Sequence, residues 1–201
     1  DQIATLRKVQ QQQYVSGFAS ELDVVGIHRI NSQVCLHVLY IRETKILGSK
    51  SFFPSVPSDS SEQDIVKAFI SQHYIGSTMA ERHIPKEFVT NCALDEFDDV
   101  IDILSQQAQC QVKFSSKVQK ERSQYLKLAN INAETALISR NSHRESVQAR
   151  FQALNELFEL PKEISRLECF DISHTMGQQT VASCVVFDPQ GPLKSEYRRY
   201  N

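Results

Sequence analysis

Residues 167–201 read LECFDISHTMGQQTVASCVVFDPQGPLKSEYRRYN, an apolar run with one carboxylate near its start. The pattern predicts a first strand, a turn at 176–179, a second strand over Thr180–Phe187 and a third over Leu193–Tyr200. Asp171 is the exception in the first strand, because aspartate is depleted in strands and an unpaired buried charge is costly. We therefore expect a hydrogen-bond network, a basic partner or a cation beside it. Three antiparallel strands with a carboxylate on the first are typical of the start of an RNase H-like nuclease fold.

The run ECFDISHTMGQQTVASCVVFD, followed by GPLKSEYRRYN, resembles the start of the endonuclease domain in the UvrC family, the incision subunits of the bacterial UvrABC excinuclease. A weaker likeness extends back to Asp1. The resemblance implies a nuclease of nucleotide excision repair that cuts damaged double-stranded DNA on both sides of the lesion. It also implies Mg²⁺ or another divalent metal as cofactor, UvrB as a partner, a cytoplasmic location, and Asp171 as both the first catalytic carboxylate of the 5′ incision site and a metal ligand.

The chain is expected to be an internal fragment, since it begins with Asp1 and stops within the third nuclease strand. By the resemblance, the other metal-site acids, the catalytic histidine and a tandem helix-hairpin-helix module would follow Asn201. A second nuclease, of the GIY-YIG type, would precede Asp1. Because a lone carboxylate seldom holds magnesium well, we expect the fragment to be inactive by itself.

Composition indicates a globular protein, with 41% hydrophobic and 23% charged residues among 201. The net charge of −2 does not mark a nucleic-acid binder. No apolar run approaches the roughly 20 residues of a membrane span, and no signal peptide is visible. The five cysteines form no CxxC pair, so buried free thiols in a reducing cytosol are predicted rather than a zinc or disulfide framework. The scattered histidines show no ligand spacing.

Residues 1–16 have helical spacing and no breaker before Gly17. In the UvrC family this position holds the end of the helical UVR motif, which docks on UvrB, and only its tail is present here. The alternative is a solvent-exposed helix that leads into the next domain.

Residues 17–115 show the order of elements found in RNase H-like folds. The expected strands are 22–30, 34–42, 45–53, 87–89 and 110–114, and the expected helices run from a cap at Ser61 and Asp64 to about Tyr74 and over 95–107. The first three strands repeat the pattern of 167–201, and Gly26 falls where Asp171 falls. Because glycine has no side chain to hold a metal, we expect a non-catalytic domain with a structural or DNA-guiding role.

Four acids begin the helix predicted at 95–107: Asp95, Glu96, Asp98 and Asp99. Four neighbouring acids could form a metal-binding cluster. Negative charge in the first turn of a helix is also favoured by the helix dipole, and we prefer this structural role.

Residues 116–160 are expected to form a helical linker, as one helix or as two with a break near Asn141–Ser142. The segment from Lys113 to Arg150 contains eight basic residues and only three acidic ones. Lys117, Lys120 and Arg122 therefore either contact DNA phosphates or form an ordinary solvated helix face.

Residues 161–201 are the expected start of the endonuclease domain. Arg198 and Arg199 either contact the DNA backbone or lie on an exposed strand edge, and strand alternation allows only one of them on the substrate side. A Ser173–His174 hydrolase pair is rejected because adjacent strand residues point to opposite faces.

Two functions are consistent with these patterns. The first is a piece of an excinuclease incision subunit. The second is a non-catalytic RNase H-like scaffold that binds nucleic acid or protein. Asp171, and the acids that would follow it, distinguish the two.

Overall fold

The computed structural model describes residues 21–43, 45–75, 83–93, 97–175 and 178–200. It divides into two compact units, Asp1–Leu137 and Ile138–Asn201, which are described separately. The predicted UVR tail at 1–16, Asp95, Glu96 and residues 176–177 of the turn predicted at 176–179 lie outside the described residues. The other half of that turn is wrong, because Gln178 and Gln179 already belong to a strand.

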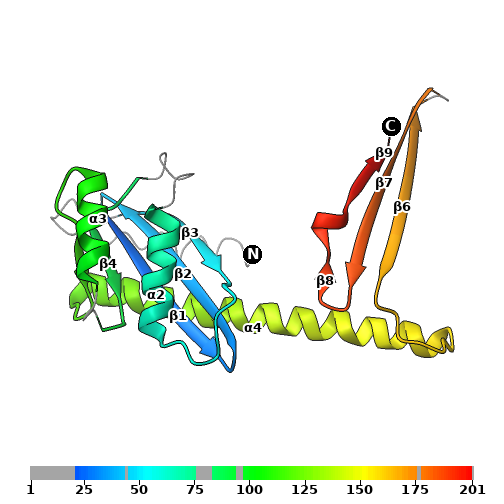
Figure 1. Cartoon of the computed structure of the whole chain (residues 1–201), viewed down its shortest axis with the longest axis horizontal. Helices are drawn as coiled ribbons and strands as arrows, with labels where there is room; N and C mark the ends of the chain where they lie inside the picture. The colour runs from blue at the N-terminus through cyan, green and yellow to red at the C-terminus, as the bar shows by residue number, and fades with distance from the viewer. Residues whose placement is uncertain (1–20, 44, 76–82, 94–96, 176–177, 201) are drawn as a thin grey trace, which may run out of the picture. The chain divides into compact units, whose positions relative to one another are not determined.

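The first unit contains a five-stranded sheet in the order β3-β2-β1-β4-β5 (Figure 1). Its strands are β1 (Leu22–Ile30), β2 (Gln33–Arg42), β3 (Lys45–Phe52), β4 (Glu87–Thr90) and β5 (Lys113–Ser115). Strands β1 to β3 pair antiparallel, whereas β4 is parallel to β1 and β5 is parallel to β4. This is the RNase H-like arrangement, so the predicted fold class is confirmed.

One face of this sheet is covered by α2 (Glu62–Ile70) and α3 (Asp98–Ala108), with a π-helical turn at Ser71–Ile75 after α2. The predicted cap is present, because the Ser61 hydroxyl accepts from the Asp64 N–H at 3.1 Å and an Asp64 oxygen accepts from the Ser61 N–H at 3.3 Å. In α3, Asp98 and Asp99 occupy the first turn as expected, and Asp99 pairs with Lys67 at 3.0 Å. These two acids therefore stabilise a helix.

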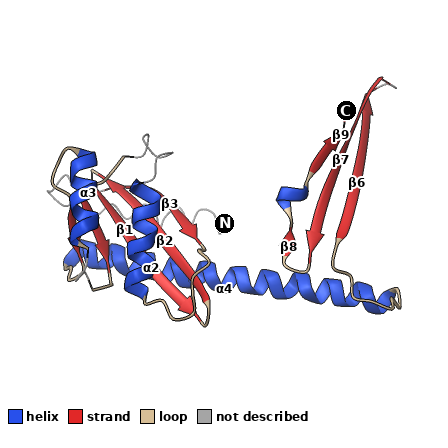
Figure 2. Cartoon of the chain, viewed as in Figure 1, coloured by secondary structure: helices blue, strands red, loops and turns tan. Residues whose placement is uncertain are grey.

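The other face of the sheet is covered by the first half of α4 (Lys120–Leu157), which Figure 2 shows as one continuous helix. The break considered near residues 141–142 is absent, since no Gly or Pro interrupts this segment. Ala129, Ala133 and Leu137 recur every fourth residue and are buried against the sheet. The first half of α4 is thus part of a core as well as a connection. No helix in the described part of the chain is long and apolar enough to cross a membrane.

Gly26 of β1 lies against the backbone of α4. A Cβ atom at this position would lie 2.4 Å from the carbonyl carbon of Ala129 and 2.6 Å from the amide nitrogen of Asn130. Beyond Val25, β1 has no partner on the β4 side, and there the Asn130 side-chain oxygen accepts the Ile27 N–H at 3.2 Å. The helix α4 therefore packs directly on the backbone of β1, and its Asn130 side chain accepts a hydrogen bond from one backbone N–H of that strand.

The second unit contains β6 (Leu167–Thr175), β7 (Gln178–Asp188), β8 (Gly191–Pro192) and β9 (Arg198–Tyr200), all paired through β7. The predicted third strand over Leu193–Tyr200 is wrong in its first half, where a 3-10 turn at Lys194–Glu196 intervenes. The Leu193 N–H still donates to the Val186 carbonyl of β7 at 2.8 Å, but the residues after it form a turn in which the Glu196 N–H donates to the Leu193 carbonyl at 3.0 Å.

The cysteine prediction is confirmed for three residues and wrong for two. Cys35, Cys92 and Cys184 are buried, whereas Cys110 and Cys169 are exposed. Cys110 lies in the connection before β5 rather than in the strand, and Cys169 lies on the exposed first strand of the second sheet.

We predict that Gly26→Ala destabilises the first unit by about 3 kcal/mol, because the new methyl group must displace the α4 backbone. Gly48→Ala is the matched control: it makes the same change in the same sheet, at a position with nothing within 4 Å of the new atom. Its effect should stay within about 0.5 kcal/mol. Urea denaturation followed by circular dichroism measures both, and equal stability of the two variants would contradict the packing described.

Candidate functional site

Asp171 lies in the middle of the first strand of the second sheet. It is the fifth residue of the nine-residue β6 and pairs with Ser183 of β7. Its side chain is exposed, and the Ser173 hydroxyl donates to its Oδ2 at 3.3 Å. No Lys or Arg pairs with it among the described residues. Of the partners expected beside Asp171, the described residues supply a hydrogen bond from Ser173 and no basic side chain, and a cation stays a prediction.

Strand register decides which arginine shares the face of Asp171. Asp171 pairs with Ser183, and Ser183 pairs with Arg199, so the three form one row across β6, β7 and β9. Directly paired residues project to the same face of a sheet, and neighbours in sequence to opposite faces. Arg198 is in the adjacent row with Cys184, and its Nη1 donates to the backbone carbonyls of Ser195 and Tyr197. Arg199 is therefore the arginine on the Asp171 side.

The donor set at Asp171 fits one ligand of a hard cation such as Mg²⁺. Magnesium prefers oxygen ligands and is usually held by one or two carboxylates together with phosphate. Within the described residues no group of three or more His, Cys, Asp or Glu could hold a metal ion. Asp171 can thus supply one carboxylate, and the described part of the chain does not complete a metal site.

Gly26 occupies the corresponding position of the first sheet. Strands β1 and β6 each have nine residues, and Gly26 and Asp171 are each the fifth. In the second sheet this position carries an exposed carboxylate, whereas in the first it lies against the backbone of α4. The second sheet is therefore open to solvent at Asp171, whereas the first sheet is covered by α4 at the matching position, Gly26.

A second strand carboxylate, Asp23, escaped the sequence analysis. It is fully buried, with Arg42 Nη1 at 2.7 Å from its Oδ1 and the Tyr74 hydroxyl at 2.5 Å from its Oδ2. Burial raises the pKa of Asp23, while the hydrogen bonds from Tyr74 and Arg42 oppose that shift. The signal used for Asp171, an acid within an apolar strand, is equally present in LDVVG at 22–26. Through its bond to Tyr74, Asp23 ties the turn after α2 to the sheet.

The basic residues predicted to contact DNA differ in their partners. Lys117 and Lys120 are exposed, and Lys120 begins α4. Arg122 pairs with Glu87 of β4 at 2.9 Å, so its charge is already engaged within the first unit.

The topology of the first sheet, together with a second sheet that begins in the same way, defines an RNase H-like protein of two units. A family model described as the UvrC Ribonuclease H-like domain matches residues 21–140, and one described as the UvrC RNAse H endonuclease domain matches residues 155–201. The chain belongs to the UvrC family.

Several relatives named UvrABC system protein C match the whole chain. Identity is 60% over 206 residues with the protein of Colwellia psychrerythraea strain 34H, of which the match covers 32%. It is 46% with the protein of Serratia proteamaculans strain 568 and 44% with that of Shewanella baltica strain OS195, of each of which 33% is covered. The chain thus spans about a third of the length of the relatives it matches.

Neutralising the two strand carboxylates should change the stability of the protein by very different amounts. Asp23→Asn should destabilise the first unit by about 3 kcal/mol, because it leaves Arg42 without its buried counter-ion. Asp171→Asn should change stability by no more than about 0.5 kcal/mol, since the exposed carboxylate holds no ion pair in the described structure. Urea denaturation measures both, and a large loss from Asp171→Asn would mean that this residue has a structural role.

Proposed function

We propose that this chain is part of the incision subunit of a UvrABC nucleotide excision repair nuclease, which cuts damaged DNA on both sides of the lesion. Asp171 is then the first carboxylate of the metal-dependent 5′ incision site. One observation carries the proposal: in a chain of the UvrC family, an exposed carboxylate stands at the centre of the first strand of the endonuclease sheet.

The chemistry requires a carboxylate that a phosphate can reach. A divalent metal, when bound, makes a water nucleophilic and stabilises the leaving oxygen of a phosphodiester. Asp171 would be one ligand of that metal, on a strand that limits its movement. Ser173 orients the carboxylate through Oδ2 and leaves Oδ1 without a partner among the described residues. The exposure of this face supports substrate access.

Arg199 is proposed to position the DNA backbone beside Asp171. The two residues are in one row, two strand spacings or about 10 Å apart along the sheet. A phosphate between them is within reach of an extended arginine side chain, and guanidinium binds phosphate well.

Lys117 and Lys120 are proposed to contact DNA phosphates at the start of α4. Cations at a helix N-terminus are opposed by the helix dipole, so they do not stabilise α4 there. The same position suits an anion, because unpaired backbone N–H groups and lysines both attract it. This argument favours a DNA contact over a solvated face.

The first unit is proposed to have no catalytic site of its own at Gly26. The close packing of α4 supports a structural or DNA-guiding role, which is the scaffold function considered as the alternative for the chain. Docking on UvrB through residues 1–16 stays a prediction, and loss of UvrB from a pull-down when these residues are deleted would support it.

We predict that Asp171→Ala abolishes the 5′ incision in a protein of the relatives' length that carries this sequence, because the metal loses a ligand. Binding of lesion-containing duplex should stay within about twofold of the unmodified protein, since the exposed carboxylate makes only one hydrogen bond, to Ser173, in the described structure. An incision assay with Mg²⁺ and a gel-shift assay measure the two. Retained 5′ incision would refute the assignment.

Charge reversal at the proposed DNA contacts should weaken binding and flatten its salt dependence. The paired change Lys117→Glu and Lys120→Glu should do so, and Arg199→Glu should do so separately, because each removes phosphate neutralisation. Fluorescence anisotropy with a labelled duplex over a range of salt concentrations measures both the affinity and the salt slope.

Arg198→Glu is the control for Arg199→Glu, with the same change in charge one residue away on the opposite face. It should leave the affinity within about twofold. If both arginine variants weaken binding equally, the strand register does not determine which arginine contacts DNA, and the assignment of Arg199 is wrong. If the lysine variant leaves the salt slope unchanged, the start of α4 is an ordinary solvated surface.

A further inference from the structure

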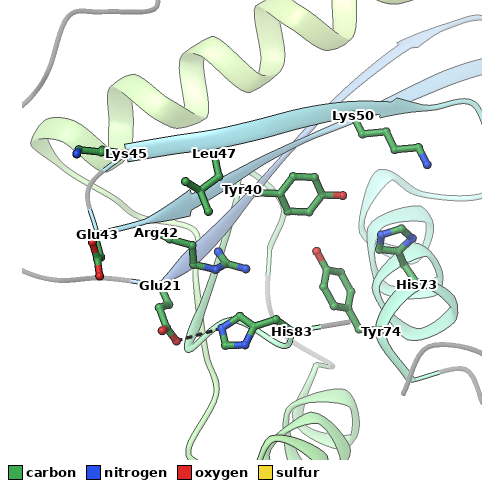
Figure 3. A pocket seen from close by; sticks show the side chains of 10 residues that line it. All are labelled: Glu21, Tyr40, Arg42, Glu43, Lys45, Leu47, Lys50, His73, Tyr74 and His83. Carbon is green, nitrogen blue, oxygen red and sulfur yellow. Dashed lines mark hydrogen bonds and ion pairs between the residues drawn. The ribbon is translucent and has the colours of Figure 1, made fainter. Parts of the chain in front are cut away.

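A cavity of about 730 Å³ opens on the first unit beside the edge strand β3 (Figure 3). Its lining comes from β2, β3, the turn after α2 and the segments that precede β1 and β4, and includes Tyr40, Leu47, Lys50, His73 and Tyr74. The volume is in the range of about 300–1,000 Å³ that small-ligand sites occupy. Neither the Asp171 face nor the basic start of α4 contributes to it.

The base of this cavity is fixed by buried polar bonds. Asp23 holds the Arg42 guanidinium at 2.7 Å and the Tyr74 hydroxyl at 2.5 Å. His73 stacks on Phe69 with ring centroids 5.0 Å apart and meets Tyr74 edge-on, also at 5.0 Å. Rings and guanidinium are therefore held in place before any ligand arrives, which lowers the entropy lost on binding.

Lys50 provides a cation at the aromatic end of the cavity. Its Nζ lies 5.1 Å from the centre of the Phe52 ring, and no acid pairs with it among the described residues. Figure 3 shows the Lys50 side chain on the same side as His73 and Tyr40. The acid Glu21 lines the far end and is occupied by His83 at 3.2 Å and Lys86 at 3.9 Å.

We propose that this cavity binds a nucleotide, with its phosphate beside Lys50 and its base against the Tyr40 ring. Sites for unpaired nucleotides combine a cation that meets the backbone with aromatic faces on which bases stack. Lys50 supplies the cation and the partly exposed Tyr40 ring supplies the stacking face, while the buried His73 and Tyr74 rings form the fixed wall behind them. The nucleotide comes either from a single strand of nucleic acid or from the free pool. This site does not depend on the proposed incision chemistry.

The chain contains no tryptophan, so a single introduced indole reports on the cavity alone. Leu47 lines the cavity and is 70% exposed, which makes Leu47→Trp tolerable to the fold. The whole 201-residue chain carrying Leu47→Trp is titrated with thymidine 5′-monophosphate and, separately, with oligothymidylate of about 10 nucleotides. Saturable quenching of the indole is expected. The control reporter Ile103→Trp, on α3 and 46% exposed, should show none.

Lys50→Glu in the Leu47→Trp background should weaken the quenching on the order of tenfold. Lys113→Glu makes the same change in charge on β5, at the opposite edge of the sheet, and should alter the affinity less than twofold. Quenching by both ligands identifies a nucleotide pocket, and quenching by the oligonucleotide alone identifies a single-strand site. No quenching by either, equal quenching of the Ile103→Trp reporter, or equal loss from both lysine variants would overturn the proposal.

Discussion

The close approach of α4 to the backbone of β1 is the contact on which the first unit depends. It requires a residue without a side chain at position 26, since a Cβ there would overlap the Ala129 backbone. Polar bonds surround this contact. Asn130 accepts the Ile27 N–H, and the Asn132 amide donates to Nε2 of His37 at 3.3 Å, which leaves Nδ1 to donate to Ser51 at 2.8 Å. Burial lowers the pKa of His37 and so favours the neutral ring that this pattern needs.

The same constraint distinguishes the structures of the two sheets at their matching positions. Both begin with a nine-residue strand, but α4 covers the middle of one, while the middle of the other presents a carboxylate to solvent. Desolvation decides what each carboxylate can do. Asp23 is buried and must be paired by Arg42 and Tyr74, so its oxygens are occupied. Asp171 is exposed, and the proposed metal contact needs a carboxylate in that state.

Sequence patterns predicted the order of strands and helices along the first unit, the Ser61–Asp64 cap and the matching positions of Gly26 and Asp171. These features follow from local alternation and capping chemistry, which a sequence displays directly. The sequence-based predictions failed where tertiary contacts determine the local structure. The strand predicted from Leu193 is interrupted at Lys194–Glu196, where the chain forms a 3-10 turn. Cys110 is exposed because β5 begins only at Lys113. The Asp23 network and the cavity join residues far apart in the chain, from Glu21 to His83, and no spacing rule reveals them.

Hydrogen exchange at the Ile27 amide tests most directly whether α4 closes the first sheet. This N–H has no strand partner on its side of β1, so only the Asn130 side chain and the packed helix can protect it. Closure by α4 predicts exchange slowed on the order of 10³-fold or more relative to an unstructured amide, because exchange then requires the helix to leave the sheet. Exchange at the rate of an exposed strand edge would show that α4 does not cover Gly26, and the contrast between the two sheets would be lost.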